Sequence, residues 1–241
     1  MVISVDTGNK HMKTENCEFN SGVEILDTLP GELEEAIQYE GKYYVTTNKR
    51  ISYMEDKTAD DRYYILTLFA IAKELSYREK NEGLLPQNLQ EIELLVGLPP
   101  AHYGKHRKKF REYFYRNGAV AEFCYKGISY RIVFKEVKVY IQAYAAYCLL
   151  AVKKQLSVIP KILLIDIGGF TVDYMVLRFG QLEMEYVDSL ENGVIRLYNS
   201  IKAAIRKKYS ILLDEEDIDN IILERGGCYK PELKERVREV A

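Results

Sequence analysis

The sequence predicts an α/β protein made of two similar units, in which mixed strands are flanked by helices. A short apolar strand ends in an acidic residue and a glycine turn twice, once at residues 2–8 and again at residues 162–168. Between these turns the hydrophobic period switches repeatedly between two and about 3.6 residues, as it does when strands and helices alternate. With 241 residues the chain is long enough to bury a substantial core.

The second turn, Asp166-Ile-Gly-Gly-Phe-Thr-Val-Asp173, is the most informative stretch. Gly168 and Gly169 have no Cβ, so backbone N–H groups can crowd around an anion there. Asp166 would repel that anion unless a cation lay between them, which implies Mg²⁺ bound through water. Thr171 adds a hydroxyl. The stretch therefore predicts a phosphate-and-magnesium loop.

The chain opens with a second version of this turn, at Asp6-Thr-Gly-Asn-Lys-His-Met-Lys13. Gly8 permits a tight turn, Asn9 tolerates unusual backbone angles, and Lys13 can bring a point charge to a phosphate. Either turn alone is weak evidence, because Asp-x-Gly also occurs in ordinary hairpins and at strand ends. The pair indicates two halves of one nucleotide site.

The periodicity places the expected elements along the chain. A proline near residues 157–160 separates a first strand–hairpin–helix series from a second. We expect strands at 2–6, 91–98 and 161–167, strands around a Gly41 turn at 35–46, a hairpin of 121–125 and 128–140, and a hairpin at 171–187 that turns at Phe179-Gly180. We expect helices at 61–78, 105–116, 142–154, 194–208 and 230–240.

Composition narrows the class of protein. Hydrophobic residues make up 47% of the chain and the net charge is −2, which argues against disorder and against a strongly basic nucleic-acid binder. No apolar run is long enough to cross a bilayer, and four scattered cysteines without a Cys-x-x-Cys pair are typical of a reduced, cytoplasmic protein. We therefore expect no direct nucleic-acid binding and no membrane partner.

The two turns, in this order, resemble the phosphate motifs of the superfamily that contains actin, sugar kinases and the seventy-kilodalton heat-shock chaperones. Within it, the chain is most similar to the bacterial actin-like ATPases of the ParM/StbA plasmid-segregation family. Five further stretches carry that resemblance: Phe19-Asn-Ser-Gly-Val, Tyr39-Glu-Gly-Lys-Tyr-Tyr-Val, Lys57-Thr-Ala-Asp-Asp, Val96-Gly-Leu-Pro-Pro100 and Val139-Tyr-Ile-Gln-Ala143.

The resemblance implies an actin-like ATPase fold with two ribonuclease-H-like subdomains. Domain I would cover residues 1–157, with the first phosphate loop and a small insertion lobe, and domain II residues 158–241, with the second loop. The family's adenosine-binding strand and glycine turn have one candidate here, residues 221–227, and it comes too early. We therefore expect a C-terminally truncated chain with an incomplete second subdomain, which binds ATP weakly and forms no ordered filaments.

The resemblance also assigns roles to site residues. Gln142 would orient the attacking water, where some members of the family carry glutamate; otherwise it is an ordinary residue at a helix start. Asp6 and Asp166 would hold Mg²⁺ through water. Phosphates would contact Asp6, Gly8, Asn9, Lys13, Gly168, Gly169 and Thr171, and the ribose and adenine would contact Gly193, Lys202 and Arg206, unless Gly193 only caps a helix and the two cations only lie on a solvated helix face.

The function implied for the complete protein is an ATP-binding, Mg²⁺-dependent ATPase that polymerises head to tail and segregates plasmid or phage DNA with a DNA-binding adaptor. The alternatives are a non-catalytic actin-fold interaction protein and a small-molecule kinase, although the kinase needs an acidic general base that the sequence does not show. His102 and His106 lie four apart, but Gly104 and a Pro-Pro-started loop argue against a metal site there.

Overall fold

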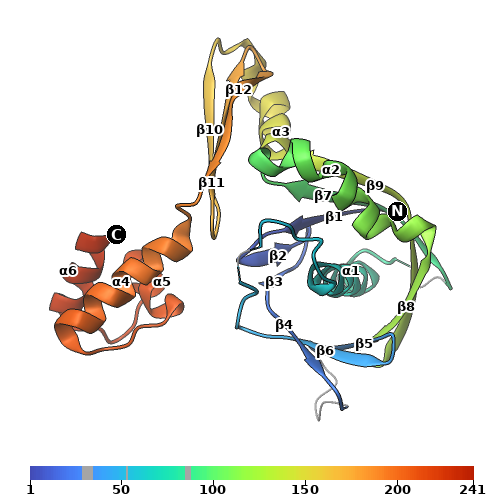
Figure 1. The fold of residues 1–241 in the computed structure, drawn as a ribbon, viewed down its shortest axis with the longest axis horizontal. Helices are drawn as coiled ribbons and strands as arrows, with labels where there is room; N and C mark the ends of the chain where they lie inside the picture. Colours follow the sequence, from blue (N-terminus) through green and yellow to red (C-terminus); the bar gives the residue numbers. More distant parts are fainter. Residues whose placement is uncertain (29–34, 53, 85–87) are drawn as a thin grey trace. The chain divides into compact units, whose positions relative to one another are not determined.

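The computed structural model describes residues 1–28, 35–52, 54–84 and 88–241. In these residues a nine-stranded sheet, a three-stranded sheet and six α-helices are present, which confirms the expected α/β class (Figure 1). The large sheet contains, in spatial order, β3 (Glu18–Asn20), β2 (His11–Lys13), β1 (Val2–Thr7), β7 (Gln90–Leu98), β9 (Ile128–Ile141), β8 (Val120–Tyr125), β5 (Ala36–Tyr39), β6 (Lys42–Thr46) and β4 (Val23–Leu26).

The centre of the large sheet is parallel, and this determines where polar side chains gather. β1 pairs in parallel with β7, and β7 in parallel with β9. The carboxyl ends of these three strands therefore meet at one edge of the sheet. In β1 the side chains of Ile3, Val5 and Thr7 are buried, whereas Ser4 and Asp6 alternate with them.

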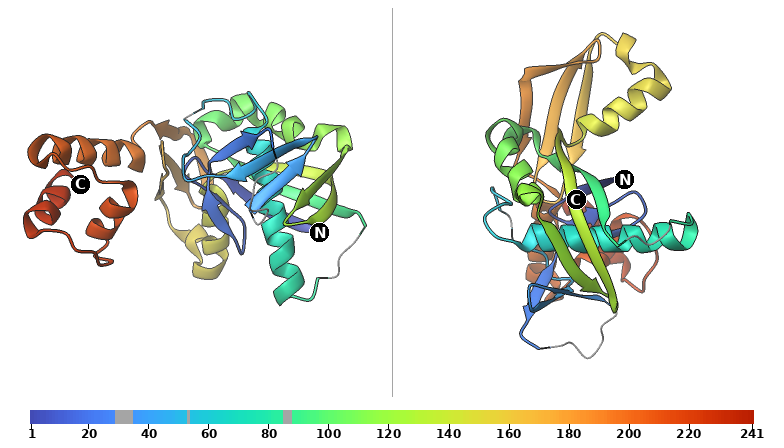
Figure 2. Two further views of the ribbon diagram at one scale, coloured as in Figure 1. Left: turned by 90° about the horizontal axis from the view of Figure 1, so that it is seen from below. Right: turned by 90° about the vertical axis from the view of Figure 1, so that its right-hand side faces the viewer.

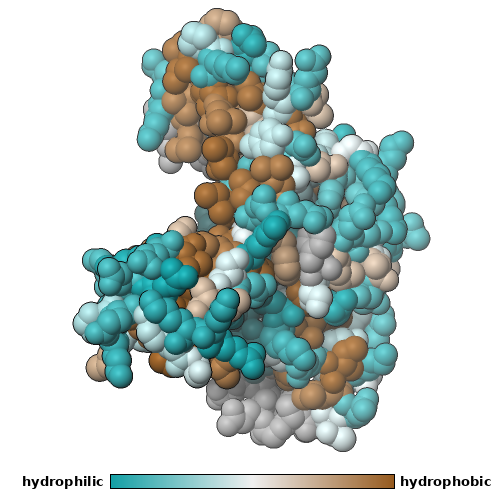
Figure 3. Space-filling view, turned by 60° about the vertical axis from the view of Figure 1, so that its left-hand side comes forward, coloured by the Kyte–Doolittle hydropathy of each residue, from teal (hydrophilic) through white to brown (hydrophobic). Residues whose placement is uncertain are grey.

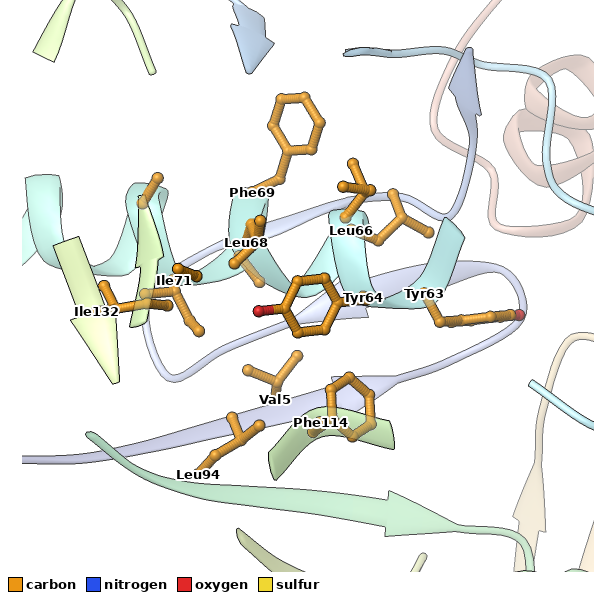
Figure 4. Packing of buried hydrophobic residues seen from close by; sticks show 14 of the residues in the cluster. Val5, Tyr63, Tyr64, Leu66, Leu68, Phe69, Ile71, Leu94, Phe114 and Ile132 are labelled. Carbon is orange, nitrogen blue, oxygen red and sulfur yellow. The ribbon is translucent and has the colours of Figure 1, made fainter. Parts of the chain in front are cut away.

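Helix α1 (Arg62–Asn81) supplies much of the hydrophobic core that packs against the large sheet. Twelve of its residues are buried, as expected for a helix that is apolar nearly all round. It lies inside the curve of the sheet, where Tyr64 and Ile71 point toward Val5 and other sheet residues, and Leu66 and Phe69 point the opposite way (Figures 1 and 4). Each large apolar side chain buried in this way contributes roughly 1.5–3 kcal/mol, so this helix anchors the strands that carry the site.

One buried side chain of α1 is charged. The Glu74 carboxylate accepts hydrogen bonds from Thr14 Oγ1 at 2.6 Å, Asn16 Nδ2 at 2.9 Å and Arg78 Nε at 2.7 Å. Burial raises its pKa, but these hydrogen bonds outweigh burial and hold the pKa of Glu74 below its ordinary value. Glu74 thus ties the turn after β2 to the central helix.

Helix α2 (Pro100–Tyr115) covers the opposite face of the sheet through Phe110 and Phe114, whose rings meet edge to face at 5.0 Å. The expected loop at its start is wrong. Pro100 begins the helix, because a missing N–H costs nothing in the first turn, and Gly104 lies within it. His102 and His106 are consequently one turn apart, with ring centroids 5.8 Å apart.

The small sheet is built from β10 (Ile162–Ile167), β11 (Val172–Arg178) and β12 (Gln181–Leu190), in chain order. Helix α3 (Tyr144–Lys154) packs on one face, where Tyr147, Met175 and Leu177 are buried. The turn at Phe179-Gly180 has positive φ at both residues, as a tight hairpin requires. Apolar side chains lie exposed on this sheet (Figure 3): Leu163, Ile165, Ile167, Met184 and Tyr186.

The last part of the chain forms a helical cluster of α4 (Val194–Tyr209), α5 (Glu215–Ile222) and α6 (Pro231–Val240), seen together in Figure 2. Asp214 and Asp217 form a capping box at the start of α5. Residues 221–227, the candidate for a strand and glycine turn, instead include the end of α5. The buried side chains shared by the three helices are Tyr198, Ile201, Ile205, Leu213, Ile218, Ile221, Leu233 and Val237.

By packing, the chain divides into two compact units. Unit 1 contains residues 1–166 and 173–189, and unit 2 contains residues 167–172 and 190–241. The small sheet therefore belongs mainly to unit 1, and the glycine turn after β10 belongs to unit 2. The expected boundary between domains at residues 157 and 158 stays a prediction. None of the helices within the described ranges is both long and apolar enough to span a membrane.

Candidate functional site

Asp6 and Gln142 come together at the carboxyl ends of the central parallel strands. Asp6 is the penultimate residue of β1, and Gln142 follows Ile141, the last residue of β9. The backbone N–H of Gln142 donates to the carbonyl of Leu98 at 2.9 Å, which fixes the start of its side chain. Gln142 Nε2 then donates to Asp6 Oδ1 at 3.0 Å. Gln142 thus lies in the turn between β9 and α3, not within the helix as expected.

Gly97, in β7, makes room for this contact. A Cβ placed on Gly97 would lie 2.7 Å from Gln142 Cγ and 3.5 Å from Gln142 Nε2. Contacts between carbon atoms normally begin near 3.5 Å, so a side chain at this position would displace Gln142. The glycine therefore allows the Gln142 side chain to pass over the middle strand and reach Asp6.

A buried lysine lies behind the first turn. Lys57 is 5% exposed, and its Nζ donates a hydrogen bond to the carbonyl of Thr7, the last residue of β1. The ammonium also lies over the ring of Tyr63, 5.0 Å from the centroid. Burial lowers the pKa of Lys57 to about 8, although Asp6 and Asp173 both act to raise it.

The first turn, between β1 and β2, is held on several sides. A Cβ on Gly8 would lie 2.5 Å from the carbonyl oxygen of His11, so only glycine fits this turn without a shift. Ser21 Oγ donates to the carbonyl of Gly8 at 2.6 Å, and the Tyr63 hydroxyl donates to Asn9 Oδ1 at 2.8 Å. The conformation of the turn is therefore fixed by its surroundings.

Lys13 lies directly across from Asp6 in the β1–β2 pairing. Its Nζ is 3.6 Å from Glu18 Oε1, and both side chains are about half exposed. The pKa of Asp6 is raised, chiefly because surrounding protein atoms remove part of its hydration and further because Asp166 is negative nearby. Lys57 and Lys13 oppose that shift, as does the hydrogen bond from Gln142. The structure thus brings Asp6, Lys13, Gln142 and Asp166 into one electrostatic environment.

The second turn is bound to the start of helix α4. The N–H of Gly168 donates to the carbonyl of Thr171 at 2.8 Å, which closes the turn. The N–H groups of Gly193, Val194 and Ile195 donate to the carbonyls of Phe170, Gly168 and Gly169 at 2.9, 3.1 and 2.9 Å. The first N–H groups of a helix have no acceptor within the helix, and here carbonyl groups of the turn accept hydrogen bonds from three of them.

A comparison with models of protein families shows to which family the chain belongs. Residues 4–144, more than half of the sequence, match the model of the actin-like proteins' N-terminal domain. The chain belongs to the actin-like proteins. A search of curated proteins finds no match.

Solved structures of other actin-like proteins share the fold of this one. An archaeal actin homolog, Ta0583, superimposes with a TM-score of 0.76 at 14% identity, covering 99% of this chain and 78% of its own. A complex of Ta0583 with ADP gives a TM-score of 0.74 at 14% identity over 99% and 77% of the two chains. A non-polymerisable mutant of pCBH ParM gives 0.70 at 19% identity over 99% and 79%. These likenesses confirm the expected actin-like fold.

The acidic residues of this actin-like chain fit a hydrated magnesium ion. Asp6 and Asp166 are each the penultimate residue of a strand, and the charge of Asp166 acts on the Asp6 carboxyl. Mg²⁺ keeps most of its waters and uses one or two carboxylates together with phosphates. Among the described ranges, no group of three or more His, Cys, Asp or Glu side chains could hold a metal on its own.

The residues predicted to bind ribose and adenine lie apart along α4. Gly193 packs on the second turn, since a Cβ there would lie 2.4 Å from the Gly169 carbonyl oxygen. At 1.5 Å per residue, Lys202 and Arg206 lie about 14 and 20 Å further along the helix. Lys202 Nζ is 3.6 Å from Glu215 Oε1. Their contact with a nucleoside stays a prediction.

Sequence reasoning missed three residues of the site. Lys57 and Gly97 lie within stretches that carried the family resemblance, but no role was assigned to either. Their roles depend on pairing between distant segments, since 50 residues separate Lys57 from Thr7, and Gly97 meets Gln142 only because β7 pairs with β9. Tyr63 was missed because it resembles any other apolar residue of α1. A lysine just before a helix whose first half is largely apolar was the one available signal.

Proposed function

We propose that this protein binds ATP with Mg²⁺, hydrolyses it and polymerises into filaments that segregate plasmid or phage DNA. The contact between Gln142 and Asp6, at the carboxyl ends of the central strands, carries the catalytic part of the proposal. The filament part rests on likeness of fold, since solved relatives include an AlfA filament from a B. subtilis plasmid and an Alp12 filament. An adaptor that connects the filament to DNA would be the remaining partner.

The orientation of the Gln142 amide supports a role in placing water. The Asp6 carboxylate only accepts hydrogen bonds when ionised, so the amide nitrogen must face it. The amide oxygen is then directed away from Asp6 and can accept a hydrogen bond from an attacking water. Transfer of a phosphoryl group to water depends mainly on positioning and on neutralising charge, and a neutral amide can do the first.

The phosphates would be held by the two glycine turns. Gly8, Asn9 and Lys13 would contact them from the first turn, and Gly168, Gly169 and Thr171 from the second. Bound Mg²⁺ supplies positive charge to the phosphate oxygens. Asp6 and Asp166 would accept hydrogen bonds from its waters.

The test is Gln142→Ala, measured by phosphate release and by calorimetry with ATP and Mg²⁺. Hydrolysis should slow roughly ten- to a thousandfold while the ATP Kd changes little, as expected when positioning alone is lost. The matched control is Gln38→Ala, an exposed glutamine on β5 in the same unit. A collapse of ATP affinity in Gln142→Ala would contradict a catalytic role.

Sedimentation of the full-length gene product with and without ATP and Mg²⁺ tests the filament. A nucleotide-dependent pellet supports the proposal. A protein that binds ATP but neither hydrolyses it nor sediments would be a non-catalytic interaction protein of the same fold. A soluble protein that phosphorylates a metabolite would be a kinase, for which Gln142 offers no proton-accepting base.

A further inference from the structure

Lys57 is a buried cation to which the proposed function assigns no role. It lies just before α1 and is 5% exposed. An isolated ammonium would lose most of its hydration free energy at such a position, so it must be compensated by its neighbours. The Thr7 carbonyl accepts one of its hydrogen bonds, and the Tyr63 ring lies beneath it at 5.0 Å.

The charges that act on Lys57 come from two different sheets. Asp6 lies at the end of β1 in the large sheet, and Asp173 lies near the start of β11 in the small sheet. Asp173 is itself only 4% exposed. One ammonium thus interacts with two carboxylates from different sheets. The pKa of His102, on α2, is lowered chiefly by burial, and the charge of Lys57 adds to that shift.

We propose that Lys57 is a positioning residue of the phosphate site, which fixes the end of β1 through Thr7 and supplies the positive charge that Asp6 and Asp173 share before any nucleotide binds. It is too deeply buried to touch a phosphate itself, so it acts through Asp6 and through the backbone that leads into Gly8. The effect on nucleotide binding rests on the proposed function, whereas the interaction of Lys57 with the two carboxylates can be tested in the protein without nucleotide.

The first test is a double-mutant cycle on the protein without nucleotide, using Lys57→Met, Asp173→Asn and the double variant. Lys57→Met keeps the length of the side chain and removes its charge. Removing the ammonium that acts on the buried Asp173 carboxylate should lower Tm by about 10 °C. Asp173→Asn should restore several degrees in the Lys57→Met background, because it removes the buried negative charge on which Lys57 acted. The control is Lys138→Met, a surface lysine paired with Glu93.

Additive Tm changes in this cycle would overturn the proposal, since a lysine that only fills space or only bonds Thr7 has no reason to interact with Asp173. If Lys57→Met does not fold at all, recovery of folded protein in the double variant supports the proposal, and failure of both variants while Asp173→Asn folds overturns it.

The second test is calorimetry with ATP and Mg²⁺. Lys57→Met should raise the ATP Kd about tenfold, because the first turn loses its fixed geometry. A Kd within twofold of the wild-type value would overturn the positioning role, even if the thermal cycle shows coupling. Should the wild-type protein bind no ATP, the proposed function fails, and the thermal cycle alone decides whether Lys57 balances the two carboxylates.

Discussion

Gly97→Ala adds a single methyl group beside the Gln142 side chain. The new Cβ would lie 2.7 Å from Gln142 Cγ, so Gln142 must move by roughly 1 Å to reach an ordinary contact distance. The hydrogen bond from Nε2 to Asp6 Oδ1 is 3.0 Å long and would not survive such a shift. We expect hydrolysis to fall about a hundredfold, the usual consequence of a 1 Å misplacement.

Stability should change little in the same variant. Replacing a strand glycine stabilises a protein by about 0.4–1 kcal/mol through the unfolded chain, whereas mild overpacking costs about 1 kcal/mol or more. These two effects nearly cancel, so Tm should stay within about 3 °C of the wild-type value. ATP affinity should also be close to wild type, because Gln142 is not proposed to hold the nucleotide.

The assay is steady-state phosphate release combined with thermal unfolding and calorimetry. Gly104→Ala is the matched control, since a Cβ there meets no atom within 4 Å and the residue lies within α2. The variant Gly97→Ala/Gln142→Ala should be no slower than Gln142→Ala alone, because both changes act through the same side chain. Unchanged hydrolysis in Gly97→Ala, or further slowing in the double variant, would refute the reasoning.

Three further changes test other parts of the molecule. Asp166→Ala should abolish hydrolysis with little loss in Tm, and near-normal phosphate release would remove this residue from the mechanism. Glu74→Ala should lower the free energy of unfolding by about 3 kcal/mol in urea titrations at pH 7. Because the folded-state pKa of Glu74 is lowered, its contribution is present above the unfolded pKa and lost as pH falls through the folded value, so the variant should lose less stability between pH 5 and 3 than the wild type. Ile165→Lys, on the exposed face of the small sheet, should reduce aggregation and the binding of a dye that recognises exposed apolar surface, without lowering Tm. Unchanged aggregation would show that this face does not cause the protein to aggregate.

Strong local patterns made most of the fold predictable from sequence. The two Asp-x-Gly turns, the hairpin at Phe179-Gly180 and helix α1 all follow from residues close together in the chain. The short strands β2, β3 and β4 were missed, because each is three or four residues long and is stabilised by pairing with a neighbour. Helix α5 was missed for a similar reason, since its eight residues depend on a capping box and on packing against α4 and α6.

The site was predictable only in part. Asp6 and Gln142 could be named because motif order pointed to them, but their direct contact joins residues 136 positions apart. The start of α2 was misjudged because consecutive prolines usually indicate a loop, although a proline is well tolerated in the first turn of a helix. The role of Gly97 requires knowledge of strand order, which puts β7 between β1 and β9.

The hydrogen bonds between the second glycine turn and α4 make the amides of Gly193, Val194 and Ile195 natural reporters. Each of these N–H groups points at a carbonyl of the turn, so none can exchange its hydrogen with solvent until the turn and the helix separate. Their exchange rates therefore measure how often this joint opens. A ligand that orders the turn should slow exchange at all three amides together, and at no other position in the first turn of α4 to the same degree.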